Sequence, residues 1–308
     1  MLNLLISKQG AKLPLLFMTK YAAPAKVNLH LAITDVREDG FHELNTSFVY
    51  VDVGDELTIE LADELHVACS DSSLNGEKNL VFQVLKAFRQ QYAVAQGLDV
   101  YIQKNLPAQA GLGGGSSDAA TALMAANRLW AVGCSRSELI AFAKPFGADI
   151  PCFIYGRASL AAGVGEKLSD YPDEIHSGHI VVAWPGKGVS TAAAFTHFDK
   201  NYFHALTDER GGAKVRARSD DGGFDLGYND LEQSAKMLCL PLENMLAVMR
   251  QQSVRAWMSG SGSACVALCQ SSEDAQKLAD SLVQKSLASW VHVGRFLPEH
   301  PLEKNIGA

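Results

Sequence analysis

A run of glycines ahead of a predicted helix constrains this chain more than any other feature of its sequence. Residues 107–118 read Pro-Ala-Gln-Ala-Gly-Leu-Gly-Gly-Gly-Ser-Ser-Asp, so four of these twelve positions are glycine and two hydroxyl side chains follow them. Glycine lacks a Cβ, which permits a positive φ and lets backbone N–H groups approach a ligand closely. The N-terminus of the following helix adds unpaired N–H groups and the positive end of the helix dipole. The segment therefore predicts a phosphate-binding site, with a flexible loop and an ordinary helix cap as the alternative.

The glycine-rich segment does not fit the most familiar nucleotide-binding signatures. A Walker A loop requires a lysine after its last glycine, and no lysine follows Gly115. A dinucleotide fingerprint that began at Gly111 would place glycine or alanine where Ser116 stands. The sequence also has neither the His-Arg-Asp nor the Asp-Phe-Gly triplet of protein kinases. We therefore expect a nucleotide-binding loop of another design.

Composition narrows the possible partners. The 308 residues suffice for one large or two medium domains, and the net charge of −7 argues against a general nucleic-acid or anionic-membrane surface. The six cysteines form no Cys-x-x-Cys pair and the nine histidines no His-Glu-x-x-His pair, so neither a disulfide framework nor a zinc site is indicated. We expect a cytoplasmic protein with reduced thiols, without nucleic-acid or membrane partners, that acts as a monomer or weak homodimer.

The N-terminal segment lacks the features of a targeting sequence. Its apolar stretch is interrupted by Lys8 and Lys12 and split by Pro14, whereas a secretory signal needs a basic start and a longer apolar run. No stretch of the chain approaches the ~20 apolar residues of a membrane span. We expect residues 1–20 to be a dispensable extension, with Met18 as an alternative start.

Hydrophobic periodicity predicts a chain in which strands and helices are mixed. Gly54 and Asp55 are expected to form a turn between two strands, and residues 147–153 to turn sharply and then extend. The charged, glycine-rich residues 199–227 are expected to form a mobile surface excursion. We expect strands at residues 27–33, 48–53, 56–61, 98–103, 180–184, 254–258 and 264–268, and helices at residues 79–95, 119–129, 137–146, 192–198 and 240–251. Such mixing favours an α+β fold with two lobes.

Three short motifs together resemble a known superfamily. Residues 24–29 (Pro-Ala-Lys-Val-Asn-Leu), 111–118 and 259–264 (Ser-Gly-Ser-Gly-Ser-Ala) are similar, in this order and spacing, to the three motifs of the GHMP kinases, which include galactokinase, homoserine kinase and mevalonate kinase. Residues 39–43 (Asp-Gly-Phe-His-Glu) and 147–153 (Gly-Ala-Asp-Ile-Pro-Cys-Phe) narrow the resemblance to the kinases of 4-diphosphocytidyl-2-C-methyl-D-erythritol. The resemblance runs from about Ala23 to Phe296.

This resemblance implies a two-lobed fold and a phosphoryl transfer. The N-terminal lobe would be ribosomal protein S5 domain 2-like and the C-terminal lobe ferredoxin-like, with an ATP-binding domain at residues 21–160, a substrate-binding domain at 161–297 and a tail at 298–308. ATP would phosphorylate the 2-hydroxyl of the methylerythritol moiety of a cytidine diphosphate conjugate. The alternatives are another GHMP kinase, for mevalonate or homoserine, or a non-catalytic nucleotide or sugar sensor with this fold.

Lys26 and Asp149 are the candidate catalytic residues. Lys26 lies within a predicted strand among apolar neighbours, where an uncompensated ammonium is costly, so we expect an anionic partner, either Asp149 or the transferring phosphate. Gly147 and Pro151 flank Asp149 in a turn, and the resemblance implies that its carboxylate is the base that receives the hydroxyl proton. The alternatives are an edge-strand lysine that reaches solvent and an aspartate that caps a helix or turn.

The resemblance also implies a set of substrate-binding residues. His42 would read the edge of the cytosine, and Phe41 and Phe195 would stack on its two faces. Many members of the family have tyrosine in place of Phe41, so any hydroxyl contact is lost in this chain. Asn28, on the same strand face as Lys26, and Thr191 would contact the substrate as well. Without the resemblance, His42 would be an ordinary exposed polar residue, Asn28 polar filler and Thr191 a helix cap.

On the ATP side, the resemblance points to residues before, within and after the glycine-rich segment. The expected set is Asn79, Leu80, Lys104, Gly111, Leu112, Gly113, Gly114, Gly115, Ser116 and Ser117. Lys104 could equally be a solvated strand end, and Gln109 and Ala110 occupy positions where the family often has glycine. The backbone amides of residues 259–263 would lie near the phosphates or brace the first loop, a simple glycine turn being the alternative. Mg²⁺ is expected with the nucleotide, which supplies most of its ligands, and no protein ligand is assigned.

Overall fold

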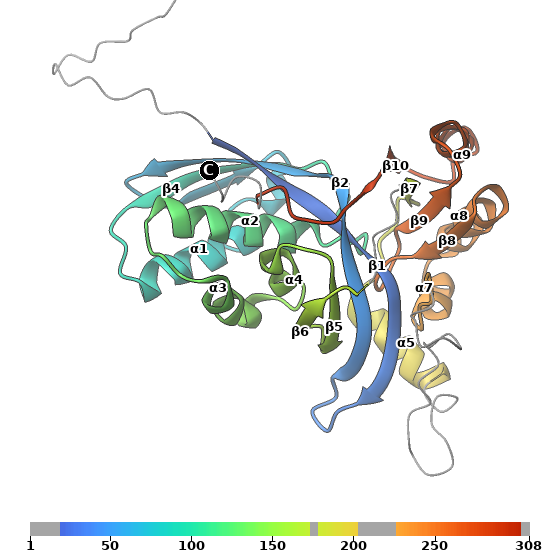
Figure 1. Ribbon diagram of the computed structural model, residues 1–308, viewed down its shortest axis with the longest axis horizontal. Helices are drawn as coiled ribbons and strands as arrows, with labels where there is room; N and C mark the ends of the chain where they lie inside the picture. The colour runs from blue at the N-terminus through green and yellow to red at the C-terminus, as the bar shows by residue number, and fades with distance from the viewer. Residues whose placement is uncertain (1–18, 173–177, 203–225, 303–308) are drawn as a thin grey trace, which may run out of the picture.

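The chain folds into two lobes, each built on its own sheet (Figure 1). The computed structural model describes residues 19–172, 178–202 and 226–302. Helices and strands are mixed along both lobes, so the α+β prediction is confirmed. In this described part, no helix combines the length and apolar character that crossing a bilayer requires.

The first lobe is organised around one long strand, β2. Its partner β1 runs antiparallel along one edge, and three strands share the other edge of β2 in turn. β3 and β6 extend the sheet beyond β4 and β5. The strands are β1 (Thr19–Val36), β2 (His42–Ala62), β3 (His66–Cys69), β4 (Gly97–Gln103), β5 (Ser159–Gly163), β6 (Lys167–Asp170) and β11 (Phe296–Leu297).

Helices cover one face of this first sheet (Figure 1). They are α1 (Leu80–Gln91), α2 (Gly114–Leu129), α3 (Arg136–Ala143) and α4 (Ile150–Tyr155), with single 3₁₀ turns at Ser72–Leu74 and Lys144–Phe146. α1 is amphipathic, because Val81, Val84, Leu85 and Phe88 recur at helical spacing and are all buried. α2 packs between α1 and the strands β1 and β2, so its N-terminus is held firmly where the glycine-rich segment ends.

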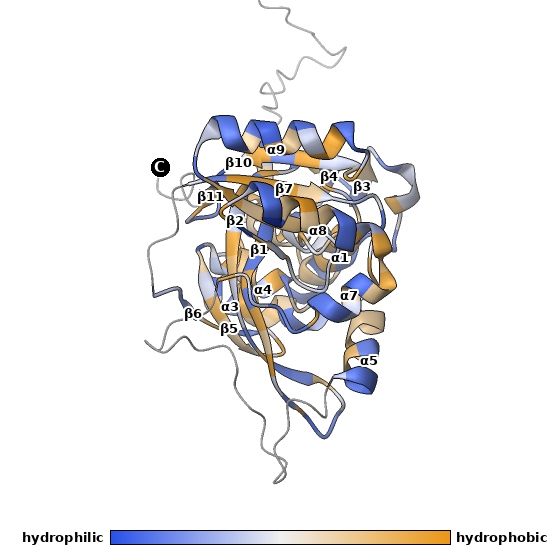
Figure 2. Ribbon diagram, turned by 90° about the vertical axis from the view of Figure 1, so that its right-hand side faces the viewer, coloured by the Kyte–Doolittle hydropathy of each residue, from blue (hydrophilic) through white to orange (hydrophobic). Residues whose placement is uncertain are grey.

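The second lobe has the ferredoxin-like order of elements. Its antiparallel sheet runs β10-β7-β9-β8, with α8 between β7 and β8 and α9 between β9 and β10. Figure 2 looks onto this lobe and shows α9 with a largely hydrophilic outer surface above the apolar strands of the sheet. The elements are β7 (His179–Trp184), α5 (Thr191–Asn201), α7 (Glu232–Leu238), α8 (Leu240–Gln252), β8 (Arg255–Met258), β9 (Cys265–Cys269), α9 (Ser272–Gln284) and β10 (Trp290–Gly294).

A shared hydrophobic core joins the two lobes. Val27 and Val49 from the first sheet pack in one buried cluster with Ile180, Val266 and Trp257 from the second. The Trp257 indole also donates to the backbone oxygen of Asn28 (2.8 Å). Strand β1 is therefore fixed against the second lobe at the point where the candidate site lies.

The predicted turn at Gly54 and Asp55 is wrong, because β2 runs through both residues without a break. A Cβ at Gly54 would lie 2.1 Å from the backbone oxygen of Ala23, so glycine serves the close approach of two strands at this position. Asp55 is buried, and its carboxylate accepts from the backbone N–H groups of Asn105 (2.6 Å) and Leu106 (2.9 Å). At this position the glycine allows β1 and β2 to approach closely, and the aspartate is a buried, hydrogen-bonded carboxylate.

The extended segment expected after Gly147 is also wrong, because residues 150–155 form helix α4. Pro151 stands in the first turn, where its missing N–H costs nothing, and Gly156 ends the helix with a φ of 87°. The apolar Ile-Pro-Cys-Phe run resembles a buried strand in the sequence, but all of it packs as a short buried helix.

Several expected boundaries differ from the observed elements. The expected domain limit at residues 160/161 falls inside β5, which pairs with β2 in the first sheet, as β11 does. Residues 19–20, expected within the N-terminal extension, pair with β2 as the start of β1. Of the excursion expected at residues 199–227, residues 199–201 close helix α5, and residues 203–225 lie outside the described residues.

Candidate active site

The glycine-rich segment ends at the open N-terminus of α2. Gly113 occupies the N-cap position with a φ of 72°, and no side chain caps this end of the helix. A Cβ at Gly113 would lie 2.9 Å from Phe153 Cζ and 3.0 Å from Lys26 Cγ, so both its conformation and its surroundings require glycine. The first backbone N–H groups of α2 consequently remain available to a ligand, and the helix dipole favours an anion there.

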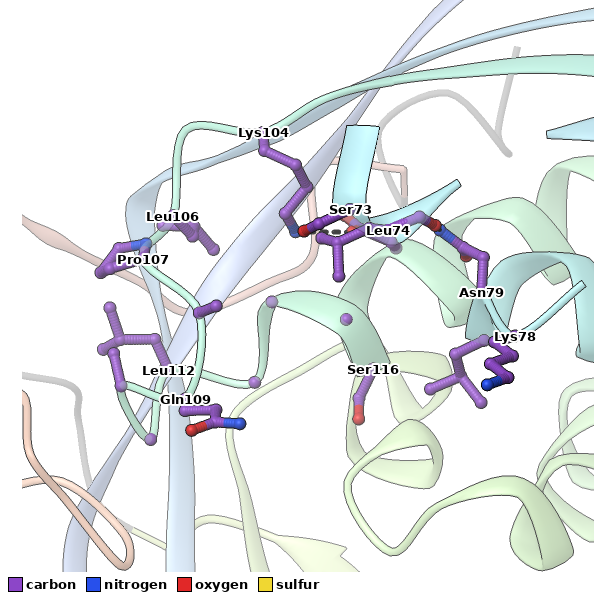
Figure 3. Close-up of a pocket in the computed structure, with 18 of the residues that line it drawn as sticks. Ser73, Leu74, Lys78, Asn79, Lys104, Leu106, Pro107, Gln109, Leu112 and Ser116 are labelled. Atoms are coloured by element: carbon purple, nitrogen blue, oxygen red, sulfur yellow. Dashed lines mark hydrogen bonds and ion pairs between the residues drawn. The ribbon is translucent and has the colours of Figure 1, made fainter. Parts of the chain in front are cut away.

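A cavity of about 470 Å³ opens at this helix N-terminus. Figure 3 shows Leu106, Pro107, Gln109 and Leu112 on one side of the helix start, and Ser73, Leu74, Lys78 and Asn79 on the other. The cavity wall includes Asn79, Leu80, Lys104, Gly111, Leu112, Gly113, Gly114, Gly115 and Ser116 from the expected ATP-binding set. We call this cavity the nucleotide pocket, after the ligand that the sequence analysis predicts for it.

Two residues of the expected ATP-binding set are engaged elsewhere. Ser117 does not line the nucleotide pocket. Its hydroxyl is buried and donates to the backbone oxygen of Pro24 (2.7 Å). Asn79 lines the pocket, but its side chain caps α1 by accepting from Val81 N (2.9 Å) and donating to Leu74 O (2.8 Å). The side chain of Asn79 therefore shapes the pocket wall by fixing the start of α1.

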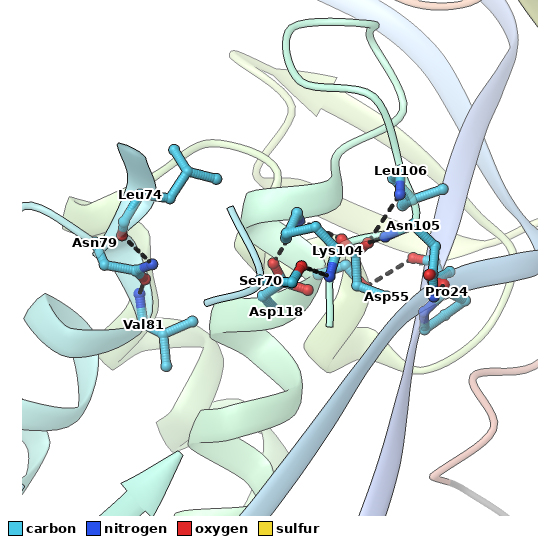
Figure 4. Close-up of polar contacts among 12 residues, drawn as sticks. Pro24, Asp55, Ser70, Leu74, Asn79, Val81, Lys104, Asn105, Leu106 and Asp118 are labelled. Carbon is cyan, nitrogen blue, oxygen red and sulfur yellow. Dashed lines mark hydrogen bonds and ion pairs between the residues drawn. The ribbon is translucent and has the colours of Figure 1, made fainter. Parts of the chain in front are cut away.

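Lys104 is held in a charged cluster at the edge of the nucleotide pocket (Figure 4). Its ammonium donates to Asp118 Oδ2 (2.8 Å) and to Asp55 Oδ2, and its side chain is only 14% exposed. The alternative of a solvated strand end is therefore excluded. Burial acts to lower the pKa of Lys104, but Asp118 and Asp55 outweigh it and the net shift of this pKa is upward.

Two carboxylates share this single ammonium, which leaves one negative charge uncompensated. Asp118 is buried, and among the described residues its Oδ1 atom has no hydrogen-bond partner. Burial, followed by the charge of Asp55, raises the pKa of Asp118 to about 7, well above that of an ordinary carboxyl group. The folded protein therefore retains a proton on this pair that the unfolded chain releases at lower pH.

We expect Asp118→Asn to stabilise the protein at pH 8. With the native pKa raised, the wild-type free energy of unfolding falls as the pH rises from about 4 to about 7, and the loss is complete above pH 7. Asparagine carries no charge there, so the variant should be more stable at pH 8 by on the order of 1–3 kcal/mol, with the difference closing toward pH 4. Thermal denaturation at both pH values measures this. Asp280→Asn, at an exposed carboxylate that accepts from Gln276, is the control. A variant less stable than wild type at pH 8 would contradict the argument.

A second, larger cavity of about 870 Å³ lies between the lobes and contains both candidate catalytic residues. We call it the acceptor pocket, after the substrate that the resemblance implies for its residues. The Lys26 ammonium lies 3.5 Å from Asp149 Oδ2 and donates to Asn28 Oδ1 (2.8 Å), and the lysine side chain is only 5% exposed. Lys26 is therefore no solvent-reaching edge lysine. Asp149 stands at the N-cap position of α4 but makes no side-chain capping bond, so its carboxylate is available to the pocket.

All five expected substrate-binding residues line the acceptor pocket: Asn28, Phe41, His42, Thr191 and Phe195. The rings of His42 and Phe195 lie 4.5 Å apart with an interplanar angle of 32°. His42 Nε2 also lies 2.7 Å from Asp199 Oδ1. Thr191 Oγ1 is 2.9 Å from Ser261 Oγ, so Thr191 does more than begin helix α5.

Phe41 differs from the other members of the expected set in its exposure. It lies at the β1–β2 connection and is 62% exposed. A large aromatic ring at the rim of a cavity offers a face on which a planar ligand can stack. The acceptor pocket therefore has one half-buried aromatic ring, Phe195, and one exposed aromatic ring, Phe41.

The two pockets meet at the glycine-rich segment, where Gln109 and Gly111 line both. The motif at residues 259–264 braces this junction. Ser259 Oγ accepts from Asn28 N (3.1 Å) and donates to Gly111 O (3.3 Å), and Ala264 N donates to Ala110 O (2.8 Å). A Cβ at Gly111 would lie 2.7 Å from Ser259 O, so the two loops are in direct contact.

Gln109 adopts a φ of 54°, a conformation that favours glycine. This accounts for the glycine that the family often has at this position. The loop nevertheless reaches the same junction, where Gln109 packs close to Gly188 of the second lobe. A residue other than glycine at this φ adds local backbone strain to the loop.

Sequence reasoning missed several residues of the two pockets. Lys78 lines the nucleotide pocket, and the only indication of this in the sequence is that a cation directly precedes the predicted helix. Asp55 was assigned to a turn, and Asp118 was part of the glycine-rich motif without a role. Asp199 lies within a charged stretch that gave no reason to single it out, although it lines the acceptor pocket.

The arrangement suits the transfer of a phosphoryl group between two small molecules. A helix N-terminus accommodates phosphates on one side, and a buried ammonium with an available carboxylate stands on the other. Phosphoryl transfer demands positioning and charge stabilisation more than covalent chemistry, and a carboxylate near the attacking hydroxyl acts as a base.

Comparison with known proteins agrees with this geometry. Residues 79–157 match the model of the GHMP kinases N terminal domain, and residues 217–288 that of the GHMP kinases C terminal domain. The chain is 36% identical over 272 residues to the 4-diphosphocytidyl-2-C-methyl-D-erythritol kinase of Desulfitobacterium hafniense (strain Y51), covering 87% of this chain and 93% of the relative. Identity to the same kinase of Nitrosomonas europaea is 36% over 290 residues, covering 92% and 99% of the two chains.

The folds agree as well. A crystal structure of 4-(cytidine 5'-diphospho)-2C-methyl-D-erythritol kinase superposes with a TM-score of 0.72 at 32% identity, covering 90% of this chain and 99% of the other. The predicted S5 domain 2-like and ferredoxin-like lobes and the resemblance found in the sequence are confirmed. The chain is thus a member of the GHMP kinases, ATP-dependent small-molecule kinases, and belongs within them to the family of the 4-diphosphocytidyl-2-C-methyl-D-erythritol kinases.

Proposed function

We propose that this chain uses ATP to phosphorylate the 2-hydroxyl of 4-diphosphocytidyl-2-C-methyl-D-erythritol, a step of the non-mevalonate pathway to isoprenoid precursors. One observation carries the proposal: the nucleotide and acceptor pockets meet at Gln109 and Gly111, with the Lys26–Asp149 pair on the acceptor side. ATP in the first pocket could therefore direct its terminal phosphate toward a hydroxyl in the second.

In this proposal Asp149 is the base and Lys26 its charged partner. The hydroxyl proton passes to the Asp149 carboxylate as the oxygen attacks the γ-phosphorus, and ADP leaves. Lys26 is oriented by Asn28 and lies close enough to hold the carboxylate in position and to stabilise charge on the transferring group. Asn28 is held in turn by donating to Thr46 Oγ1 (2.8 Å).

The cytidine end of the substrate would lie toward the β1–β2 connection. There His42 would hydrogen-bond the base edge, and Phe41 and Phe195 would stack on its two faces. Thr191, at the start of α5, would contact the part of the substrate nearest Ser261.

The triphosphate would lie over residues 111–116, at the N-terminus of α2, with the adenosine toward Asn79, Leu80 and Lys104. Ser117 would act structurally, by tying α2 to β1. Mg²⁺ would arrive with ATP and neutralise phosphate charge. Most of the ligands of such an ion would be phosphate oxygens and water, and no protein ligand is assigned.

Three broader features complete the proposal. We place the limit between the ATP-binding and substrate-binding domains between β6 and β7, because β5 and β6 belong to the first sheet. We propose that the chain acts as a monomer or weak homodimer. We propose a cytoplasmic location, where ATP is available.

An ADP-release assay over a panel of acceptors tests the proposed reaction. The panel contains 4-diphosphocytidyl-2-C-methyl-D-erythritol, mevalonate, homoserine and galactose. Only the cytidine conjugate should support turnover, because only it offers a base to the His42 and Phe195 side of the acceptor pocket. Turnover of mevalonate or homoserine at a comparable kcat/KM would support another GHMP kinase. ATP binding without ADP release for any acceptor would support a sensor.

A further inference from the structure

The contact between His42 and Asp199 adds a feature to the acceptor pocket that the proposed function does not use. His42 is the first residue of β2, and Asp199 lies on α5 of the other lobe, 157 positions away. Their side chains meet with Nε2 and Oδ1 2.7 Å apart, and both residues line the pocket. No other described residue hydrogen-bonds the His42 ring, so Nδ1 is left for a ligand.

Helix α5 brings three pocket residues to one face. Thr191, Phe195 and Asp199 are spaced four residues apart, which places them in line along the helix. All three line the acceptor pocket. The same short helix thus supplies the Phe195 ring that packs against His42 and the Asp199 carboxylate that lies beside its Nε2.

The carboxylate determines which ring nitrogen of His42 carries the proton. An ionised carboxylate accepts hydrogen bonds and cannot donate them, so Nε2 must be the protonated nitrogen facing Asp199. In the neutral ring Nδ1 is then an acceptor. The contact with Asp199 therefore fixes both the tautomer and the orientation of the imidazole.

An acceptor at Nδ1 distinguishes the two common pyrimidines. Cytosine presents an amino group at N4, which is a donor, whereas uracil presents a carbonyl oxygen at the same place. Nδ1 can accept a hydrogen bond from the cytosine amine. With uracil, two acceptors would face each other, and no hydrogen bond could form. A site that hydrogen-bonds one ligand and leaves polar groups unpaired with the other discriminates strongly.

We propose that Asp199 is a positioning residue that makes the acceptor pocket selective for cytosine over uracil, by holding His42 with Nε2 as donor and Nδ1 as acceptor. This inference rests on the proposed function and names the base specificity of the same site. Asp199 does not touch the reacting atoms, because the Lys26–Asp149 pair lies elsewhere in the pocket, so its effect falls on substrate recognition.

Kinetics with paired substrates tests this role. Wild type and Asp199→Asn are assayed with the cytidine and the uridine diphosphate conjugates of methylerythritol. An asparagine can donate or accept, so it no longer imposes one tautomer on His42. We expect the KM for the cytidine conjugate to rise about tenfold and the cytidine-to-uridine ratio of kcat/KM to fall by about tenfold or more. The KM for ATP and the kcat with saturating cytidine conjugate should stay within about threefold of wild type.

Two further variants separate positioning from a general effect of charge. Asp39→Asn removes a carboxylate near the same pocket that bonds Arg37 rather than His42, and asparagine can still accept from Phe41 N. This control should keep the wild-type ratio. In a His42→Ala background, Asp199→Asn should have no additional effect on the ratio, because the residue through which it acts is absent.

The outcomes distinguish this inference from the proposed function. An unchanged cytidine-to-uridine ratio in Asp199→Asn, with wild type active on the cytidine conjugate, would overturn the inference alone. An equal loss in Asp39→Asn, or a further loss in the His42→Ala background, would overturn it as well. A wild-type protein that phosphorylated neither conjugate would overturn the proposed function and this inference with it.

Discussion

Replacing Asp149 by asparagine is expected to lower kcat by about 10²–10⁴-fold while leaving ATP affinity nearly unchanged. Asparagine has the same shape but cannot take the hydroxyl proton. Asp149 lines the acceptor pocket and not the nucleotide pocket, which is why nucleotide binding should survive. Steady-state kinetics with the cytidine conjugate measures kcat, and titration with an ATP analogue measures binding.

A matched substitution controls for the loss of an ion-paired carboxylate. Asp170 lies 3.1 Å from Arg157 and lines neither pocket, so Asp170→Asn should retain near-normal turnover. Lys26 keeps its bond to Asn28 in the Asp149→Asn variant, so the fold should persist, as a melting curve would verify. Turnover by Asp149→Asn within about threefold of wild type would remove Asp149 as the base.

The second large effect is expected from Gly113→Ala. The added methyl would meet a positive φ of 72° and would press on Phe153 and on the Lys26 side chain at 2.9–3.0 Å. Left-handed strain of about 1–2 kcal/mol and overpacking of about 1–3 kcal/mol should together lower the free energy of unfolding by about 2–5 kcal/mol. Because Lys26 and the helix after Asp149 would both shift, kcat/KM for ATP should fall at least about tenfold.

Gly133→Ala separates strain from collision. Gly133 has a similar φ of 78°, but a Cβ there would meet no atom within 4 Å. It should therefore cost only the backbone strain, about 1–2 kcal/mol, and leave catalysis intact. Denaturant unfolding and kinetics of both variants provide the comparison. Equal losses of stability and activity in the two variants would show that the contacts of Gly113 have no special role.

The sequence predicted which residues gather at the two pockets better than it predicted the structure around Gly54 and after Asp149. The glycines before α2, the apolar neighbours of Lys26 and the turn around Asp149 each reflect a local requirement for a conformation or a charge partner. Such requirements can be inferred from a few adjacent residues. In the structure, Lys26 Nζ and Asp149 Oδ2 lie 3.5 Å apart. The nine expected residues that line the nucleotide pocket come mainly from one continuous segment, for the same reason.

What the sequence could not give depends on contacts between distant segments. Gly54 is typical of a turn in the sequence, and only the structure shows that it is needed for the close approach of Ala23. The Ile-Pro-Cys-Phe run after Asp149 is typical of a buried strand, and only the structure shows that it forms helix α4. Ser117 follows Gly113, Gly114 and Gly115 closely in sequence, but its hydroxyl donates to the backbone oxygen of Pro24 and does not face the nucleotide pocket. The role proposed for Asp199 depends on its contact with His42, and no local sequence pattern predicts this contact between distant segments.

The most direct measurement is a crystal structure with a non-hydrolysable ATP analogue and the cytidine conjugate bound together. We expect the γ-phosphate at the junction formed by Gln109 and Gly111, with the 2-hydroxyl oxygen about 2.6–3.2 Å from an Asp149 oxygen and about 3–3.5 Å from the γ-phosphorus. An analogue bound away from the N-terminus of α2, or a hydroxyl directed away from Asp149, would contradict the proposed function.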